Sequence, residues 1–221
     1  MINISNLGYI LLAYILGSIP FGYIITKLST QQNILEIGWR KTSGSNVFKN
    51  VGFWQGFLTG VFDIAKGYLA VRIAQNYGQP ELIQALSGTA AVIGHNWSLF
   101  LRFNGGRGIG TFGGALYALS PEIFKIGLII ILSWGIIWNL SIGTILMLLA
   151  VIYYGNQFNV PSVEWLGLYS LLPVFLKRLS PIKELKDSEK RKKVLLNRLI
   201  FDDDVSKDWR IKKILARLTG Q

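Results

Sequence analysis

Two apolar segments of the chain are joined by residues 94–114, GHNWSLFLRFNGGRGIGTFGG. Glycines in this stretch allow the backbone to approach a ligand closely and to point several N–H groups at one anion. A helix that starts near Ile109 would add the positive end of its dipole beside Arg107. The stretch therefore predicts a binding site for phosphate or carboxylate at a membrane surface. A tight packing turn between two membrane helices is the alternative interpretation.

The composition is typical of a membrane protein. Of the 221 residues, 51% are hydrophobic, the mean hydropathy is +0.39 and the formal net charge is +11. Apolar runs of about 17–25 residues, the length that crosses a bilayer, recur along the chain. These runs do not alternate polar and apolar residues as the strands of a transmembrane β-barrel do. The expected fold is an all-α, polytopic membrane protein.

Seven apolar segments are expected to form transmembrane helices. They span residues 4–25, 53–74, 82–101, 108–119, 123–138, 142–154 and 165–176. The fourth would be shorter than about 20 Å, which leaves a half-helix that turns back as an alternative. Lysine and arginine gather in alternate loops, however, and 14 of the 23 lie from Lys177 onward. By the positive-inside rule, seven crossings place the N-terminus outside, and the Gly-rich loop (residues 104–108) and the C-terminus in the cytoplasm.

The chain is expected to divide into a transmembrane domain, residues 1–180, and a basic cytoplasmic tail, residues 181–221. Apolar residues of the tail recur at helical spacing at positions 195, 196, 199 and 200, and at positions 211, 214 and 218. The pattern is typical of amphipathic helices on an anionic membrane surface, and a solvated tail is the alternative. With no cysteine and one histidine, the chain offers neither a disulfide nor a Cys-based or multi-histidine metal site.

Three stretches on the predicted cytoplasmic side supply cations, hydroxyls, amides and backbone N–H groups, which suit phosphate. The candidate residues are Arg40, Lys41, Ser43, Ser45, Asn46 and Lys49 in the first, Asn104, Gly105, Gly106, Arg107 and Gly108 in the second, and Ser141 in the third. Acids and bases are scarce in these stretches. Neither a Ser-His-Asp triad nor a pair of catalytic carboxylates can be assembled from them.

Asp63 and Lys66 lie three residues apart, on one face of the second predicted helix. Ionisable groups at that depth are costly, so they are expected to pair or to face a polar interior. We predict that they support the wall of the site; the alternative is that they only satisfy each other. His95 is expected to hold the Gly-rich loop from the end of a helix, with direct proton transfer as the alternative role.

The chain resembles the bacterial acyl-phosphate-dependent glycerol-3-phosphate acyltransferases, small integral membrane enzymes of phospholipid synthesis. The resemblance covers about residues 8–180 and rests on residues 17–22 (Gly-Ser-Ile-Pro-Phe-Gly), 36–38, 46–47, Asp63, 66–67, 94–95, 100–101, Phe103 and 105–108. It implies acyl transfer from an acyl phosphate to the 1-hydroxyl of glycerol 3-phosphate, which yields lysophosphatidate. It further implies a multi-pass protein of the bacterial cell membrane with its active side in the cytoplasm. The expected partners are these two substrates and membrane lipids, with no cofactor and no nucleic acid.

Several family positions carry other residues in this chain. Trp39 and Lys49 stand where the family has serine and arginine, and Arg107 stands where it has lysine. Trp138-Asn139 stands where the family has Arg-Tyr. Arg178 and Pro181 stand where the family has a histidine and an asparagine late in the chain. The resemblance implies Ser141, Asn46 and Arg107 as catalytic residues. Arg107 would hold one phosphate, and Arg40, Lys41 and Lys49 the other, with Arg178 as a further positive charge. The altered positions leave two alternatives: a non-catalytic protein that binds lipid phosphates on the same scaffold, or an acyltransferase with a different acceptor.

Overall fold

The computed structural model describes residues 4–179 and 191–202, and these residues form helices and connections without a strand. The α-helices are α1 (Ile4–Ser18), α2 (Phe21–Thr30), α3 (Gly44–Asn50), α4 (Phe53–Asn76), α5 (Glu81–Asn96), α6 (Ile109–Leu119), α7 (Pro121–Ile137), α8 (Leu140–Gln157), α9 (Pro161–Leu179) and α10 (Arg191–Phe201). Short 3₁₀ helices cover Ile34–Glu36 and Leu99–Leu101. The prediction of an all-helical chain is confirmed for the described residues.

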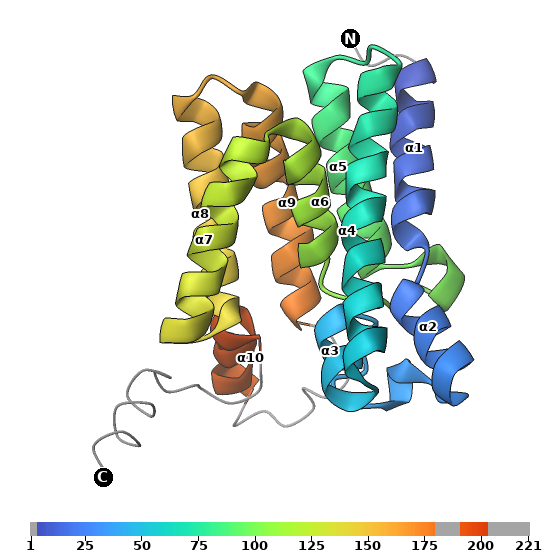
Figure 1. Cartoon of the computed structure of the whole chain (residues 1–221). Helices are drawn as coiled ribbons and strands as arrows, with labels where there is room; N and C mark the ends of the chain where they lie inside the picture. Colours follow the sequence, from blue (N-terminus) through green and yellow to red (C-terminus); the bar gives the residue numbers. More distant parts are fainter. Residues whose placement is uncertain (1–3, 180–190, 203–221) are drawn as a thin grey trace.

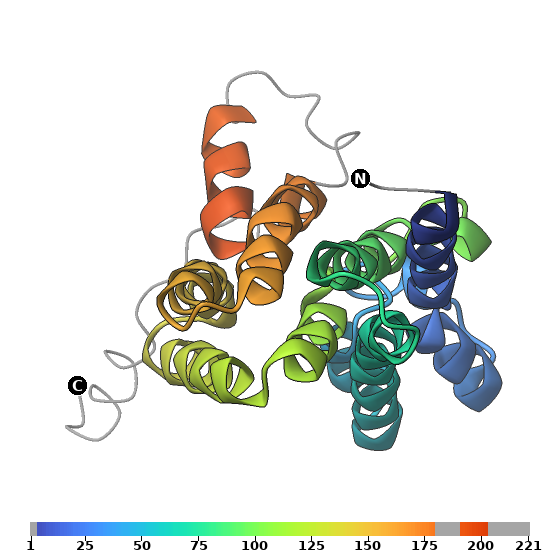
Figure 2. The same cartoon turned by 90° about the horizontal axis from the view of Figure 1, so that it is seen from above.

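Helices α1 and α4 to α9 run side by side and alternate in direction, while α2, α3 and α10 lie at one end, the lower end of Figure 1. Viewed along the bundle, α1, α4 and α5 group on one side and α7, α8 and α9 on the other, with α6 between them (Figure 2). Each of the seven predicted segments overlaps one of these seven helices, although several of the helices extend beyond the predicted bounds. The alternation brings the connections after α2, α5 and α7 to the lower end.

The first predicted segment is divided, so the expectation of one continuous helix over residues 4–25 is wrong. Proline has no N–H and disfavours a helical conformation at the residue before it, which ends α1 at Ser18 ahead of Pro20. The carbonyl of Ile19 at this break accepts hydrogen bonds of 3.2 Å from the N–H of Phe21 and of 3.0 Å from Lys66 Nζ. A buried lysine of α4 therefore satisfies the backbone at the α1–α2 junction.

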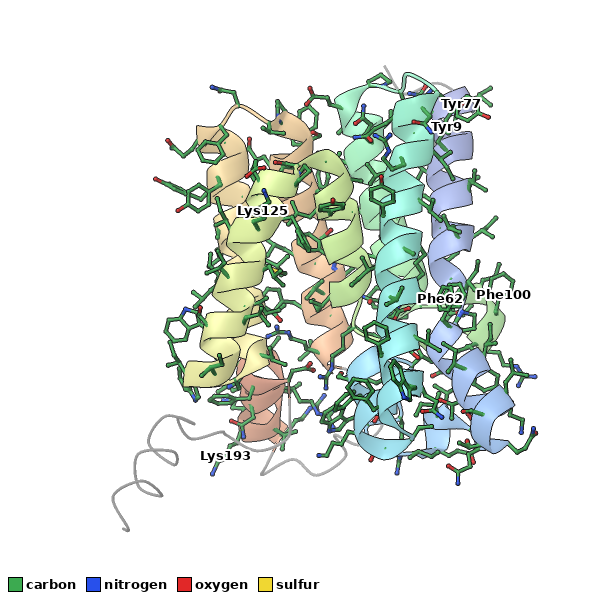
Figure 3. The ribbon with its side chains drawn as sticks, in the orientation of Figure 1. Tyr9, Phe62, Tyr77, Phe100, Lys125 and Lys193 are labelled. Carbon is green, nitrogen blue, oxygen red and sulfur yellow. The ribbon has the colours of Figure 1, made fainter. Side chains whose placement is uncertain are left out.

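The outer faces of the bundle are apolar. Leu11, Ile129 and Leu172 are among many large apolar side chains that are more than half exposed, and Figure 3 shows side chains that radiate from the helices. Apolar outer surface of this kind suits contact with lipid. By length and hydropathy, two described stretches qualify as membrane spans, Asn6–Thr30 and Leu140–Gln157. Seven crossings and the orientation in the membrane stay predictions.

Small residues allow α4 and α6 to approach closely. A Cβ on Gly67 of α4 would meet the backbone of Thr111 in α6, and a Cβ on Gly114 of α6 would meet the backbone of Ile64 in α4. Close approach at small residues is the usual way in which membrane helices pack. The packing of α6 against α4 holds the preceding Gly-rich loop beside the lower half of α4.

Helix α10 contains the first group of apolar positions expected in the tail, residues 195–200, and confirms their helical spacing. Asn197 and Arg198 form its buried side, while Leu196 is exposed. The second group, at positions 211, 214 and 218, lies outside the described residues, as does Pro181.

Candidate functional site

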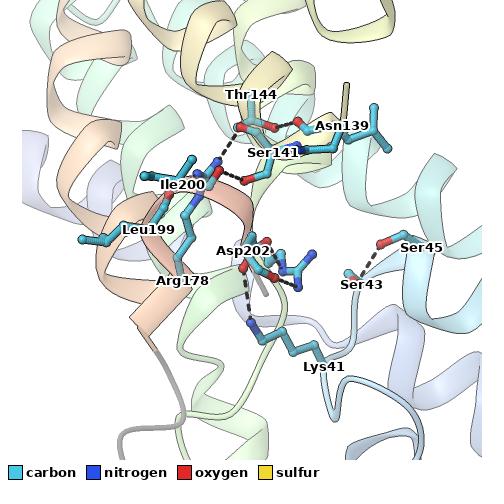
Figure 4. Close-up of polar contacts among 12 residues, drawn as sticks. Lys41, Ser43, Ser45, Asn139, Ser141, Thr144, Arg178, Leu199, Ile200 and Asp202 are labelled. Carbon is cyan, nitrogen blue, oxygen red and sulfur yellow. Dashed lines mark hydrogen bonds and ion pairs between the residues drawn. The ribbon is translucent and has the colours of Figure 1, made fainter. Parts of the chain in front are cut away.

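The lower end of the bundle brings together two cations from different connections. Lys41 Nζ lies 3.8 Å from Oδ1 of Asp202, and Arg107 Nε lies 2.5 Å from Oδ2 of the same carboxylate. Arg107 Nη2 also donates a hydrogen bond of 3.2 Å to the backbone carbonyl of Asp202. The carboxylate is 8% exposed. The polar contacts around Asp202 are drawn in Figure 4.

A second set of contacts joins the start of α8 and the end of α9 to the end of α10. Arg178 donates one hydrogen bond of 2.7 Å to the carbonyl of Leu199 and one of 3.1 Å to the carbonyl of Ser141. The Ser141 hydroxyl donates to the carbonyl of Ile200 at 2.9 Å (Figure 4). Asn139 caps α8 by accepting from the N–H of Ser141, as asparagine commonly does before a helix. This cap fixes where the Ser141 side chain emerges.

The Gly-rich loop is anchored on α5. The N–H of Gly106 donates to the carbonyl of His95 at 3.1 Å, and the N–H of Asn104 donates to that of Leu101 at 3.0 Å. A Cβ on Gly106 would meet the imidazole Nε2 of His95, so only glycine allows this approach. Helix α6 starts at Ile109, which confirms the predicted helix N-terminus beside Arg107. Two N–H groups of the loop are thus engaged within the protein, and the side chain of Arg107 contacts Asp202.

Asp63, Lys66 and His95 form a buried cluster behind the loop. Asp63 Oδ1 lies 3.0 Å from Lys66 Nζ and 3.3 Å from His95 Nδ1. The predicted pairing of Asp63 with Lys66 is confirmed, and both side chains are less than a tenth exposed. Since Lys66 also bonds to the carbonyl of Ile19, the cluster ties α4 and α5 to the α1–α2 junction. Its supporting role in the site stays a prediction.

Asn46 lies behind the connection between α2 and α3 and is fully buried. Its Nδ2 donates to the carbonyls of Ile37 and Lys41 at 3.1 and 2.8 Å. Its Oδ1 accepts from the N–H of Trp39 at 3.0 Å and from Nδ2 of Asn50 at 2.9 Å. Both ends of the amide are therefore used to shape residues 37–41. The structure places Asn46 where it positions Lys41.

The other cations of this connection differ from Lys41 in exposure. Arg40 and Lys49 are exposed, whereas Lys41 is buried. Lys49 Nζ lies 5.2 Å from the centre of the Trp39 ring, and the guanidinium carbon of Arg107 lies 5.3 Å from it. These are cation–π contacts, and they place Trp39 beside two of the cations predicted for the site.

Burial controls the charge of Lys41, which lies in the connection between helices. Its desolvation, with the positive charge of Arg107 as the next cause, lowers the pKa of Lys41 to about 8, while the negative charge of Asp202 acts in the opposite direction. Lys41 is therefore a cation that loses its proton close to physiological pH.

A cleft of about 540 Å³ has Arg107 in its lining. Its lining includes three aromatic side chains, Phe48, Phe53 and Phe57. It also includes residues predicted for the site, namely Ser43, Ser45, Asp63, His95, Arg107 and Gly108. A mostly apolar cleft with a few convergent polar groups is typical of a ligand site. Its shape and lining suit an amphiphilic molecule with an anionic head.

The sequence did not reveal that Asp202 contacts Lys41 and Arg107, or that the three phenylalanines line the cleft. Asp202 opens a run of three aspartates in a basic tail, a signal that suggests a solvated segment. Phe53 and Phe57 share a helix face at a spacing of four, which is equally typical of packing. Only contacts between segments that are distant in the sequence bring Asp202 to Lys41 and Arg107 and bring the phenylalanines to the cleft.

Comparisons with known proteins agree on one family. The family model described as "Glycerol-3-phosphate acyltransferase" matches residues 7–187. The glycerol-3-phosphate acyltransferase of Prochlorococcus marinus (strain MIT 9312) is 32% identical over 193 residues, 85% of this chain and 97% of that protein. Glycerol-3-phosphate acyltransferase 1 of Dehalococcoides mccartyi (strain ATCC BAA-2266 / KCTC 15142 / 195) is 34% identical over 210 residues, 87% of this chain and 95% of its own.

A solved structure has a similar fold. It is the crystal structure of an integral membrane glycerol 3-phosphate acyltransferase in its glycerol 3-phosphate form. The TM-score is 0.73 and the identity 26%, and the match covers 82% of this chain and 92% of that one.

Proposed function

Because the chain belongs to the glycerol-3-phosphate acyltransferase family, we propose that it transfers an acyl group from acyl phosphate to glycerol 3-phosphate. The observation that carries this proposal is the cleft, whose lining combines aromatic side chains with polar residues and the cation Arg107. The aromatic part suits an acyl chain, and the cationic part suits the phosphate groups of donor and acceptor. The product is lysophosphatidate.

The reaction requires little chemistry from the protein. The acceptor hydroxyl oxygen attacks the acyl carbonyl carbon, the bond from that carbon to the phosphate oxygen breaks, and inorganic phosphate leaves. The hydroxyl proton passes to the acceptor's own phosphate, whose second pKa is about 6. Since the acyl phosphate is already activated, no covalent enzyme intermediate is needed. Orientation and stabilisation of the developing negative charge then supply the catalysis.

The described contacts support a division of roles. The sequence assigned Arg107 and Lys41 to different phosphates, but in this scheme they bind one phosphate group, since both contact the same carboxylate. Arg178 and Ser141 lie next to this position through their contacts with the end of α10. The hydroxyls of Ser43 and Ser45, 3.3 Å apart, border the cleft and orient the acceptor.

Three further residues act indirectly in this scheme. Asn46 positions Lys41 through its hydrogen bonds to the backbone of residues 37–41. The buried Asp63 and His95 brace the Gly-rich loop from α4 and α5.

The proposal also includes location and orientation. The chain spans the cell membrane seven times, with the N-terminus outside and the lower end of Figure 1 in the cytoplasm. Two observations support this: seven long helices alternate in direction, and basic residues gather in the connections of the lower end. Both substrates then reach the cleft from the cytoplasmic side of the membrane.

The decisive experiment is a reaction of the purified protein with palmitoyl phosphate and glycerol 3-phosphate. We expect lysophosphatidate and inorganic phosphate in equal amounts, and no lysophosphatidate when glycerol 3-phosphate is omitted. Product from another hydroxyl compound but not from glycerol 3-phosphate would instead support a different acceptor. Binding of palmitoyl phosphate or lysophosphatidate without any turnover would favour the non-catalytic alternative.

A further inference from the structure

The last turn of α10 occupies the cationic end of the site. The carbonyls of Leu199 and Ile200 accept hydrogen bonds from Arg178 and Ser141, as Figure 4 shows. The last carbonyls of a helix lack partners within it and carry the negative end of the helix dipole. Arg178 and Ser141 therefore donate to the last carbonyls of α10. In the proposed reaction the same two side chains are needed for the substrates.

Asp202 completes the contact immediately after α10. Its φ of +53° is in the left-handed region, which aspartate tolerates better than most residues, and this conformation ends the helix. One carboxylate oxygen faces Lys41 and the other faces Arg107. A carboxylate and a phosphate offer arginine the same arrangement of acceptor oxygens. Asp202 thus holds the place that a substrate phosphate takes in the proposed function.

Further contacts join α10 to the end of α9 and to the connection between α7 and α8. Arg198 donates to the carbonyl of Leu179 at 3.2 Å, and the rings of Trp138 and Phe201 lie 5.7 Å apart. Leu196 is 58% exposed, so the helix does not bury its full apolar side against the bundle. An element with much exposed surface opens at low free-energy cost.

We propose that α10 is an autoinhibitory cap, in which Asp202 occupies the phosphate subsite of Lys41 and Arg107 until a phosphate monoester displaces it. The inference rests on the proposed function for the identity of the displacing ligand. A phosphate monoester carries close to two negative charges at neutral pH against one on aspartate, and so it competes effectively for the two cations. Capped and open forms are then two states whose populations depend on phosphate concentration.

The position of α10 can be measured directly because the chain has no cysteine. Spin labels on Leu196→Cys of α10 and Tyr153→Cys of α8, both at exposed positions, report the distance between the helices in lipid nanodiscs. Glycerol 3-phosphate and, separately, inorganic phosphate are expected to lengthen and broaden the distance distribution. Asp202→Asn is expected to do so with no ligand present, whereas Asp202→Glu keeps the charge and the narrow distribution.

The matched control is Glu122→Gln, which removes the same charge from an exposed pair with Lys125 at the start of α7. It should leave the distances unchanged. A triple variant that adds Asp203→Asn and Asp204→Asn to Asp202→Asn prevents a neighbouring carboxylate from replacing the lost one.

Kinetics give the second measurement. If the capped form is about nine-tenths of the population, Asp202→Asn lowers the KM for glycerol 3-phosphate about tenfold and leaves kcat unchanged. Wild-type distances and KM in the Asp202→Asn and triple variants would overturn the proposal. Release of α10 with a raised KM would also overturn it, because Asp202 would then belong to the working site. Displacement by inorganic phosphate in a protein without acyltransferase activity would retain the cap and reject only the proposed reaction.

Discussion

The charge of Lys41 makes the activity depend on pH. Its pKa of about 8 leaves about 91% of Lys41 charged at pH 7 and about 9% at pH 9. If the charged form binds the acceptor phosphate, kcat/KM for glycerol 3-phosphate falls about tenfold over this interval. The activity is therefore full below the pKa of Lys41 and is lost as the pH rises through it. We use kcat/KM because its pH dependence reports the pKa values of groups in the free enzyme.

Two substitutions isolate Lys41 as the titrating group. Lys41→Arg keeps its charge throughout this range, so the alkaline fall is expected to disappear. Lys41→Met has no charge and is expected to show a low, pH-independent kcat/KM. Asp202→Asn should move the inflection to lower pH, since the negative charge of Asp202 acts to raise the pKa of Lys41.

The assay measures initial rates at saturating palmitoyl phosphate while glycerol 3-phosphate is varied, between about pH 6.5 and 9.5. Product is quantified as lysophosphatidate, so that spontaneous hydrolysis of the donor does not contribute. A wild-type kcat/KM that stays constant to the alkaline limit would refute the reasoning. An inflection near pH 8 that persists in Lys41→Arg would assign the titration to another group.

Three other predictions concern binding, stability and topology. Arg107→Ala should weaken binding of glycerol 3-phosphate by about 1.5–3 kcal/mol in calorimetry, and Arg107→Lys by less; wild-type affinity in the alanine variant would reduce the loop to a packing turn. Asn46→Ala leaves buried backbone groups unpaired and should lower the free energy of unfolding by about 1–3 kcal/mol. Ser141→Ala, in contrast, should lose turnover while its melting temperature in detergent stays unchanged. Equal melting of Asn46→Ala and wild type would contradict the positioning role. Gln79→Cys should react with an impermeant thiol reagent on intact cells and Asn104→Cys should not; the opposite pattern would reverse the proposed orientation.

Local patterns in the sequence were sufficient for the fold class and the family. Hydropathy located the seven long helices, and the ordered motifs from Gly17 to Gly108 identified the family that the comparisons confirm. The spacing of Asp63 and Lys66 predicted their contact because three residues bring two side chains onto one helix face. The break before Pro20 also had a local signal, which the length of the apolar run obscured.

The composition of the site depended on contacts between distant segments. Asn46 has the same chemistry whether it faces a substrate or a backbone, and only the fold turned its amide toward residues 37–41. Asp202 belongs to a tail whose sequence predicted amphipathic helices on the membrane surface or a solvated segment, yet the end of α10 brings it to Lys41 and Arg107. Helical periodicity describes neighbours within about four residues, whereas the field and hydrogen bonds at a site come from every segment that packing brings together.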